Sequence, residues 1–171
     1  MNKPLTFILS LTFLFLFSGS VYGQEEVKKE YYDSGELKVE IPYKNGKPEG
    51  LETGWYDSGK KKWETHYKHG KLEGLATWWY ESGGKNEEGH FKNGELEGLA
   101  TWWYESGKKK QEIHYKNGKK DGAEKEWYIS GKKKLLAHYK NGIENGKRKE
   151  WDRGGKLTFQ GNFVDGVEEI K

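Results

Sequence analysis

Cysteine is absent from this chain, which contains only three prolines and one methionine. Without a thiol the chain cannot form a disulfide bond, a thiolate-bound zinc or iron–sulfur site, or a cysteine nucleophile. Large aliphatic residues are also scarce, since beyond residue 23 the Trp, Tyr and Phe residues outnumber Ile, Leu and Val together. This composition argues against a common two-layer core of sheets or helices, and its aromatic content argues against disorder.

The charge of the chain is nearly balanced. There are 30 Lys and Arg residues and 27 Asp and Glu residues, which gives a net charge of +3 at pH 7. A length of 171 residues is enough for one domain. So weak a net charge does not steer a polyanion to the surface, and we expect no nucleic-acid partner.

Residues 1–23 have the pattern of a secretory signal peptide. Lys3 is their only charge, residues 5–17 form a largely apolar run, and small residues follow up to Gly23. The run is shorter than the roughly 20 residues that a membrane-spanning helix needs. We therefore expect cleavage near Gly23 and a bacterial protein exported to the periplasm, the cell surface or the medium. The mature domain would be residues 24–171, and an uncleaved anchor is the alternative.

The rest of the chain repeats a unit of 24 residues without insertion or deletion. Residues 74–83 and 98–107 are identical, with the sequence GLATWWYESG. A fixed period of this length is typical of a repeat array. Three aromatic columns follow the period: Tyr31, Trp55, Trp79, Trp103, Trp127 and Trp151; Tyr32, Tyr56, Tyr80, Tyr104 and Tyr128, with Asp152 in the sixth place; and Tyr43, Tyr67, Phe91, Tyr115, Tyr139 and Phe163.

Each unit has the pattern of a β-hairpin. Residues 99–104 are rich in strand formers, and residues 105–107 suit a turn that ends in glycine. Residues 111–115 alternate between two faces, and residues 116–119 contain the Asn-Gly pair of a tight connection. No stretch between the recurring glycines is long enough for a stable helix. The period therefore predicts six hairpins, with about twelve strands in all.

The spacing of aromatic residues and glycines resembles the MORN repeat. Residues 159–166, FQGNFVDG, carry the pattern aromatic-x-Gly-x-aromatic-x-x-Gly, and residues 89–94 carry part of it. The turns rich in Lys, Asn and Gly resemble the bacterial variant of the repeat, some members of which are labelled antitoxin-like. The resemblance covers about residues 27–166 and implies an all-β, elongated, single-layer antiparallel sheet of about six hairpins, curled into an open trough. The aromatic columns suit such a sheet, because cross-strand pairs must stabilise a single layer.

Residues that commonly serve in catalysis or metal binding occur only as members of the repeat. Equivalent positions in successive units lie two strands apart, about 9–10 Å, which is too far for one ion to bind two members of a column. The serines of the first turn precede glycine and have no His–Asp partners, and no carboxylate pair stands out. We therefore expect no enzyme activity, metal, cofactor or small-molecule substrate. The histidine column consists of His66, His90, His114 and His138.

Two features depart from the repeating scaffold, and the first is a pair of tryptophan doublets in the third and fourth units. Neighbouring strand residues point to opposite faces, so both faces carry an indole there. We interpret the doublets as a candidate aromatic platform for a peptide or a glycan. Extra packing of the sheet near the centre of the array is the alternative. The platform residues are Trp78, Trp79, Trp102 and Trp103.

The second feature is a set of lysines that follow the first turn of each unit. They are expected to line one rim of the sheet, where they would attract lipid phosphates or an anionic polysaccharide. Acidic neighbours dilute their charge, so a solvated rim that resists aggregation is the alternative. This candidate basic rim consists of Lys60, Lys61, Lys62, Lys85, Lys108, Lys109, Lys110, Lys132, Lys133 and Lys134.

These observations predict a non-enzymatic exported repeat scaffold that mediates protein–protein or cell-envelope interaction. Its partner would be a protein, an envelope surface or another copy of the chain. Two alternatives stay open. One is an antitoxin- or immunity-like protein that neutralises a partner toxin, and the other is a peripheral protein that binds anionic lipid. Six copies of a structural unit do not identify the partner, because a fold is not a function.

Overall fold

Residues 23–170 of the computed structural model form one antiparallel β-sheet with 17 strands and no helix. The predicted signal segment lies outside the described residues, except for Gly23. The strands are β1 (Glu25–Tyr31), β2 (Leu37–Lys44), β3 (Lys47–Pro48), β4 (Gly50–Trp55), β5 (Lys61–Lys68), β6 (Lys71–Leu72), β7 (Gly74–Trp79), β8 (Lys85–Lys92), β9 (Glu95–Leu96), β10 (Gly98–Trp103), β11 (Lys109–Lys116), β12 (Lys119–Trp127), β13 (Lys133–Lys140), β14 (Ile143–Glu144), β15 (Gly146–Trp151), β16 (Leu157–Val164) and β17 (Val167–Glu168). The predicted all-β fold is confirmed.

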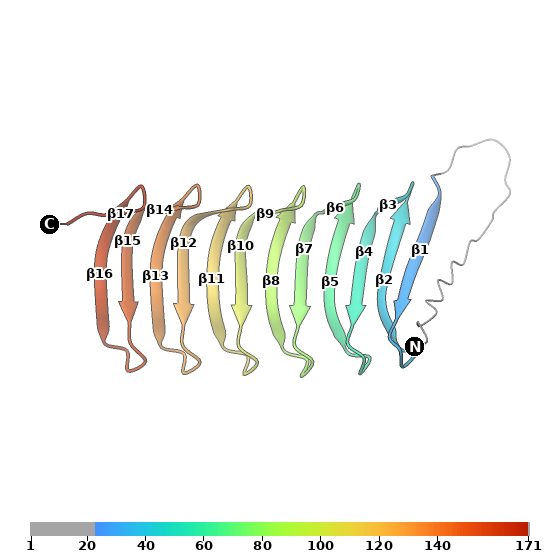
Figure 1. Cartoon of the computed structure of the whole chain (residues 1–171), viewed down its shortest axis with the longest axis horizontal. Coiled ribbons are helices and arrows are strands. Elements are labelled where there is room, and N and C mark those ends of the chain that lie inside the picture. Colours follow the sequence, from blue (N-terminus) through green and yellow to red (C-terminus); the bar gives the residue numbers. More distant parts are fainter. Residues whose placement is uncertain (1–22, 171) are drawn as a thin grey trace, which may run out of the picture.

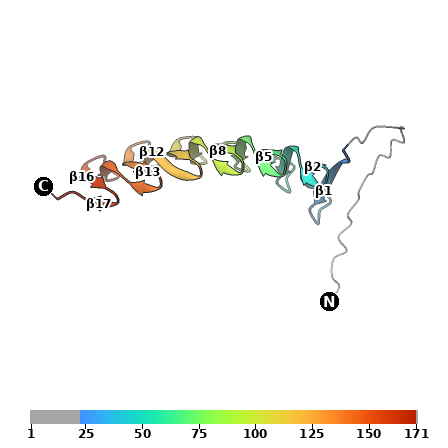
Figure 2. The same cartoon turned by 90° about the horizontal axis from the view of Figure 1, so that it is seen from above.

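The sheet is a single layer that follows the order of the chain (Figures 1 and 2). Five strands have only two residues, and the other twelve form six hairpins: β1–β2, β4–β5, β7–β8, β10–β11, β12–β13 and β15–β16. Successive hairpins pair in turn, for example through β5 with β7 and through β8 with β10. The sheet does not close, and β1 and β16 lie at opposite ends of the array (Figure 1). The prediction of about twelve strands in six hairpins is confirmed.

The tight turn between each return strand and the next short strand requires two residues in the left-handed region. Asn93 has φ 55° and Gly94 has φ 91°, and the same pair of positive values recurs in all six units. Two consecutive positive φ angles match the right-handed twist of the strands that they join. His69 and Asp165 replace asparagine in the second and sixth units without changing this geometry. The turn predicted from Asn-Gly is confirmed.

The first tyrosine column after the outward strand joins each unit to the next. The hydroxyl of Tyr80 donates to the backbone carbonyl of Trp103 at 2.7 Å. Tyr32, Tyr56, Tyr104 and Tyr128 donate in the same way to Trp55, Trp79, Trp127 and Trp151. In the sixth unit Asp152 takes the place of the tyrosine, and its carboxylate accepts a hydrogen bond from the backbone N–H of Lys156 in its own turn, at 2.9 Å. The column therefore changes from a contact between units to a contact within one turn at this position.

A second link between units is made by the residue that precedes each outward strand. The Glu73 carboxylate accepts a hydrogen bond from the backbone N–H of Asn93 at 2.8 Å, and Glu97 accepts one from Asn117 at 2.8 Å. In addition, the N–H of Gly94 donates to the Leu72 carbonyl at 2.8 Å. Each tight turn is therefore tied to the segment that leads into its own hairpin, and that segment pairs with the hairpin before it through β6 and β9. Such nearest-neighbour contacts make the stability of the array a sum over its junctions.

We expect Tyr80→Phe to lower the free energy of unfolding by about 1 kcal/mol, because it removes the hydrogen bond from the Tyr80 hydroxyl to the Trp103 carbonyl. Chemical denaturation of the full chain measures the change. Tyr31→Phe is the matched control, since Tyr31 is 49% exposed on the edge strand β1. Equal losses in the two variants would contradict the role of the tyrosine column.

The buried apolar residues of this single layer are few, and several of them are alanines. Ala76, Ala100 and Ile113 are 2%, 1% and 4% exposed, although no second sheet or helix covers them in residues 23–170. Their cover comes from larger side chains of the same face. The rings of Trp78 and Phe91 meet edge to face, with centroids 6.4 Å apart and an angle of 63° between their planes. The aromatic residues thus serve as the missing second layer.

Candidate functional site

Three tryptophans lie side by side in one row across the middle of the sheet. The pairing register places Trp63 of β5 opposite Trp78 of β7, Trp78 opposite Glu87 of β8, and Glu87 opposite Trp102 of β10. Gln111 of β11 continues the row beyond Trp102. Directly opposed residues point to the same face, so all five share one face of the sheet. We call it the Trp63 face.

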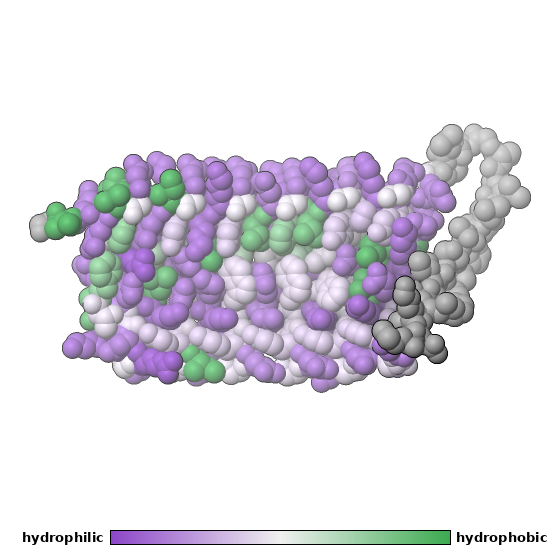
Figure 3. Space-filling view, viewed as in Figure 1, coloured by the Kyte–Doolittle hydropathy of each residue, from purple (hydrophilic) through white to green (hydrophobic). Residues whose placement is uncertain are grey.

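A parallel aromatic row runs along the same face. It lies four residues further along each return strand, where Tyr67 is opposite Leu72 and Phe91 is opposite Leu96. The row contains Tyr43, Tyr67, Phe91, Tyr115, Tyr139 and Phe163. In Figure 3, green and pale residues cover much of the middle of the sheet below a purple upper rim, and the lower border mixes pale and purple residues. The middle of this face is therefore largely aromatic, with Glu87 and Gln111 as polar members of the tryptophan row.

The two remaining platform tryptophans lie on the opposite face. Trp79 and Trp103 follow Trp78 and Trp102 directly in their strands, so they point the other way. Cations from the preceding units cover them, with Lys61 Nζ 5.5 Å from the Trp79 ring centre and Lys85 Nζ 5.8 Å from that of Trp103. The structure therefore brings Trp78 and Trp102 together and separates them from Trp79 and Trp103.

Trp63 belongs to the row but was absent from the predicted platform. It stands on a return strand, whereas Trp78 and Trp102 stand on outward strands, so it shares no column with them. The signal that points to it is Gly54, which is opposite Trp63 in the register. A Cβ at Gly54 would lie 2.5 Å from Trp63 Cδ2 and closer still to two other indole carbons. In the second unit the indole of this row thus stands on the return strand, and the opposite position on the outward strand is a glycine, which has no side chain.

Glu87 is the carboxylate within the tryptophan row. Burial raises the pKa of its carboxyl above the ordinary value of 4.5, and a hydrogen bond from Trp102 offsets part of that shift. Desolvation disfavours the charged form of an acid, which is why the pKa rises. Ionisation of Glu87 therefore carries a desolvation penalty, and a cation beside the carboxylate would offset that penalty.

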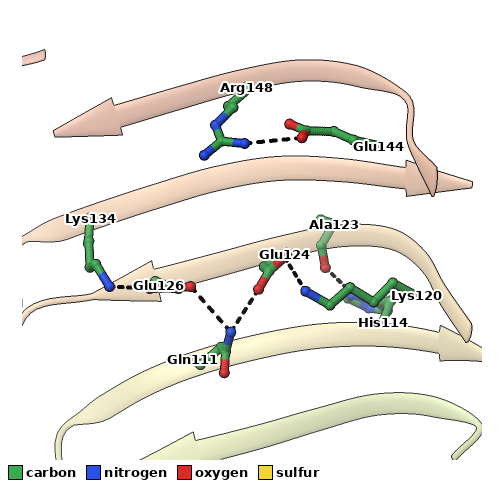
Figure 4. A network of polar contacts seen from close by, with 9 residues as sticks. All are labelled: Gln111, His114, Lys120, Ala123, Glu124, Glu126, Lys134, Glu144 and Arg148. Carbon is green, nitrogen blue, oxygen red and sulfur yellow. Dashed lines mark hydrogen bonds and ion pairs between the residues drawn. The ribbon is translucent and has the colours of Figure 1, made fainter. Parts of the chain in front are cut away.

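The row ends in a polar network toward the C-terminal half (Figure 4). The amide of Gln111 donates to Glu124 at 2.7 Å and to Glu126 at 3.3 Å. Lys120 donates to Glu124 at 2.7 Å, and Lys134 donates to Glu126 at 2.7 Å. Glu124 is only 3% exposed, so these donors satisfy a buried carboxylate.

Most lysines of the basic rim contact other residues of the sheet. The first lysine of each run donates to a carbonyl in the first turn of the next unit: Lys60 to Glu81 at 3.0 Å, Lys108 to Ser130 at 3.2 Å and Lys132 to Gly154 at 2.6 Å. The next position forms ion pairs on its own strand: Lys61 with Glu64, Lys85 with Glu88 and Lys109 with Glu112. Much of the rim charge is therefore used to join units and to neutralise carboxylates.

Three members of the histidine column lie near backbone carbonyls. The Nδ1 atom of His138 lies 2.9 Å from the Lys147 carbonyl, and those of His66 and His114 lie 3.4 Å from the carbonyls of Leu75 and Ala123. Within residues 23–170, no three His, Cys, Asp or Glu side chains are grouped as metal ligands. The same residues contain no helix that is long and apolar enough to cross a membrane.

The repeat unit matches a known family along most of the chain. No curated protein matches the chain. The family described as the MORN repeat variant matches six times, at residues 27–45, 48–69, 72–93, 96–117, 120–141 and 144–165. Each match contains one long hairpin of the sheet, or most of it, and ends at the first residue of the tight turn that follows. The chain is therefore a member of the MORN repeat variant family.

Proposed function

We propose that this chain is a non-enzymatic scaffold, exported from a bacterial cytoplasm, that holds a protein partner of the cell envelope on its Trp63 face. One observation carries the proposal: Trp63, Trp78 and Trp102 stand in a single row and remain only half-buried. Tryptophan is enriched among the residues that dominate binding energy at protein interfaces. Export rests on the signal-peptide pattern of residues 1–23.

The contacts of the basic rim favour this proposal over the lipid alternative. Lysines that donate to turn carbonyls or pair with Glu64, Glu88 and Glu112 have less charge to offer a membrane surface. The tryptophan row, in contrast, is not covered by another layer of the described chain. Repeat arrays commonly use such an extended face for binding.

We expect the double variant Trp78→Ala/Trp102→Ala to bind its envelope partner at least about 30-fold more weakly, from roughly 1 kcal/mol or more for each indole. The measurement is capture from envelope extract by the mature protein, followed by mass spectrometry and titration of the captured protein. Trp79→Ala/Trp103→Ala is the matched control, because it removes two indoles from the opposite face.

Circular dichroism and thermal unfolding establish that each variant is folded. Unchanged capture by a folded Trp78→Ala/Trp102→Ala variant would show that the row serves only to pack the sheet. Equal losses in the two double variants would also contradict a partner that is held on the Trp63 face.

A further inference from the structure

The Trp63 face supplies its own cations at several places. Near the first edge, Lys28 Nζ lies 4.1 Å from the centre of the Tyr43 ring and 3.4 Å from the Glu26 carboxylate. In the fifth unit, Lys120 Nζ lies 4.7 Å from the Tyr139 ring centre and 2.7 Å from Glu124. In both places an ammonium sits between an aromatic ring and a carboxylate, which is the arrangement that cation–π attraction favours.

The sixth unit repeats this arrangement with arginine. The guanidinium carbon of Arg148 lies 6.0 Å from the Phe159 ring centre and 5.9 Å from that of Phe163. Its nitrogens pair with Glu144 at 3.1 Å and with Glu150 at 2.6 Å. At three places on this face, a lysine or arginine of the chain itself therefore contacts both an aromatic ring and a carboxylate.

The centre of the face has two indole rings, Trp78 and Trp102, and one carboxylate, Glu87, between them. Within residues 23–170, Glu87 forms no ion pair, and no Lys or Arg lies over the rings of Trp78 and Trp102. The positions that correspond to Lys120 and Arg148 are occupied by Leu96 and Ala100 in this part of the array. The central place thus differs from the other three: its rings belong to the tryptophan row, its carboxylate is Glu87, and no cation of the described residues lies over those rings.

The spacing of the row suits one cation between the two indoles. Trp78 and Trp102 lie two strands apart, about 9–10 Å, with Glu87 on the strand between them. A cation paired with Glu87 would approach the two indoles from the strand between them, and cation–π attraction acts within about 6 Å of a ring centre. Its charge would also offset the desolvation of the Glu87 carboxylate.

We infer that the protein partner presents an arginine or lysine side chain, on an extended segment, that docks between Trp78 and Trp102 against Glu87. This inference rests on the proposed function and names the chemistry that the face recognises. Arginine is favoured over lysine, because a planar guanidinium pairs with a carboxylate and stacks on an aromatic ring at the same time. A neutral segment would leave the Glu87 carboxylate without a partner.

Two short peptides test the inference on the full mature protein. The probe is acetyl-Ser-Gly-Arg-Gly-Ser-amide, and the matched neutral probe has citrulline in place of arginine. Tryptophan fluorescence reports the titration at millimolar peptide. We expect the arginine peptide to bind at least about tenfold more tightly, and we expect Glu87→Gln to reduce that preference to less than about twofold. Binding of the arginine peptide should also weaken as the pH falls through the raised pKa of Glu87, because the protonated acid loses its charge.

Glu88→Gln is the control, since Glu88 is the next residue, points to the opposite face and pairs with Lys85. It should leave the preference for arginine unchanged. Glu87→Gln should unfold at the same temperature as the parent or higher, because it removes a partly buried carboxylate that has no cation beside it.

Equal affinity for the two peptides, or an equal effect of Glu88→Gln, overturns the inference. If both peptides bind equally and Trp78→Ala/Trp102→Ala abolishes that binding, the Trp63 face still binds partners but reads no cation. If neither peptide binds at millimolar concentration, the arginine site is rejected, and capture from envelope extract decides the proposed function separately. Preferential binding of zwitterionic phosphatidylcholine vesicles over the arginine peptide would also reject a protein segment as the occupant.

Discussion

Gly54→Ala is expected to lower the free energy of unfolding by about 1–3 kcal/mol, which is typical of an overpacked site. The added Cβ would lie 2.5 Å from Trp63 Cδ2 and nearer to two further indole carbons. A rigid ring cannot move away as the end of a flexible side chain can, so either the indole or the strand must shift. Urea denaturation of the full chain measures the loss.

Gly84→Ala provides the control for this prediction. A Cβ at Gly84 would meet only the Glu105 carbonyl, at 3.9 Å, so the change should alter stability by less than about 0.5 kcal/mol. A neutral Gly54→Ala variant would mean that Trp63 does not lie over this position.

The fold could be predicted from the sequence because each of its rules is local. The period of 24 residues, the Asn-Gly turns and the alternation of the return strand each act within one hairpin. The break of the tyrosine column at Asp152 was visible in the sequence as well. Its structural consequence required the structure, which shows that the hydroxyl of Tyr128 donates to a carbonyl of the next unit, whereas the Asp152 carboxylate accepts from the N–H of Lys156 in its own turn.

The candidate site could be predicted only in part, because it depends on the register between units. Alternation along one strand separates Trp78 from Trp79, and this was evident from the sequence. The residue of β5 opposite Trp78 depends on how two hairpins pair and on the register shift at each first turn. That shift inserts an extra residue on the return strand, and no local pattern specifies the resulting partner. Trp63 was missed for this reason.

The basic rim illustrates the same limit. Successive lysines in a run are chemically identical, but Lys60 binds a carbonyl of the next unit whereas Lys61 pairs with Glu64 on its own strand. Their sequence positions predicted a common rim and not this division. Residues that recur in every unit therefore mainly join units, and residues that occur in only a few units, such as Trp78 and Glu87, are the better candidates for binding.

Glu124→Gln is expected to lower the free energy of unfolding by about 2–3 kcal/mol. Glu124 is 3% exposed and accepts hydrogen bonds from Lys120 and Gln111, each at 2.7 Å. Removing one partner from a buried ion pair costs about 3–5 kcal/mol, and the lower value here reflects the exposure of Lys120, whose side chain is 33% accessible. The new amide nitrogen would also face the nitrogens of Lys120 or Gln111, which are donors and cannot accept its N–H groups.

Glu124 also affects the titration of Tyr139. Burial, followed by the charge of Glu124 and a hydrogen bond to it, raises the pKa of Tyr139 from 10.0 to about 12. A tyrosine with a raised pKa in the folded state loses its contribution to stability as the pH rises from the unfolded value through the folded one. The parent should therefore lose stability between about pH 10 and pH 12, and Glu124→Gln should show a smaller loss over that range.

Glu88→Gln again separates a buried contact from an exposed one. Its ion pair with Lys85 lies at the surface, with side chains 29% and 48% accessible, so its removal should cost less than about 1 kcal/mol. Urea denaturation at neutral and alkaline pH compares the two variants. If they lose equal stability, or if Glu124→Gln keeps the full alkaline loss of the parent, then Glu124 does not anchor this network. The expected difference arises because a carboxylate held among Lys120, Gln111 and Tyr139 has exchanged its water for these partners, whereas Glu88 has not.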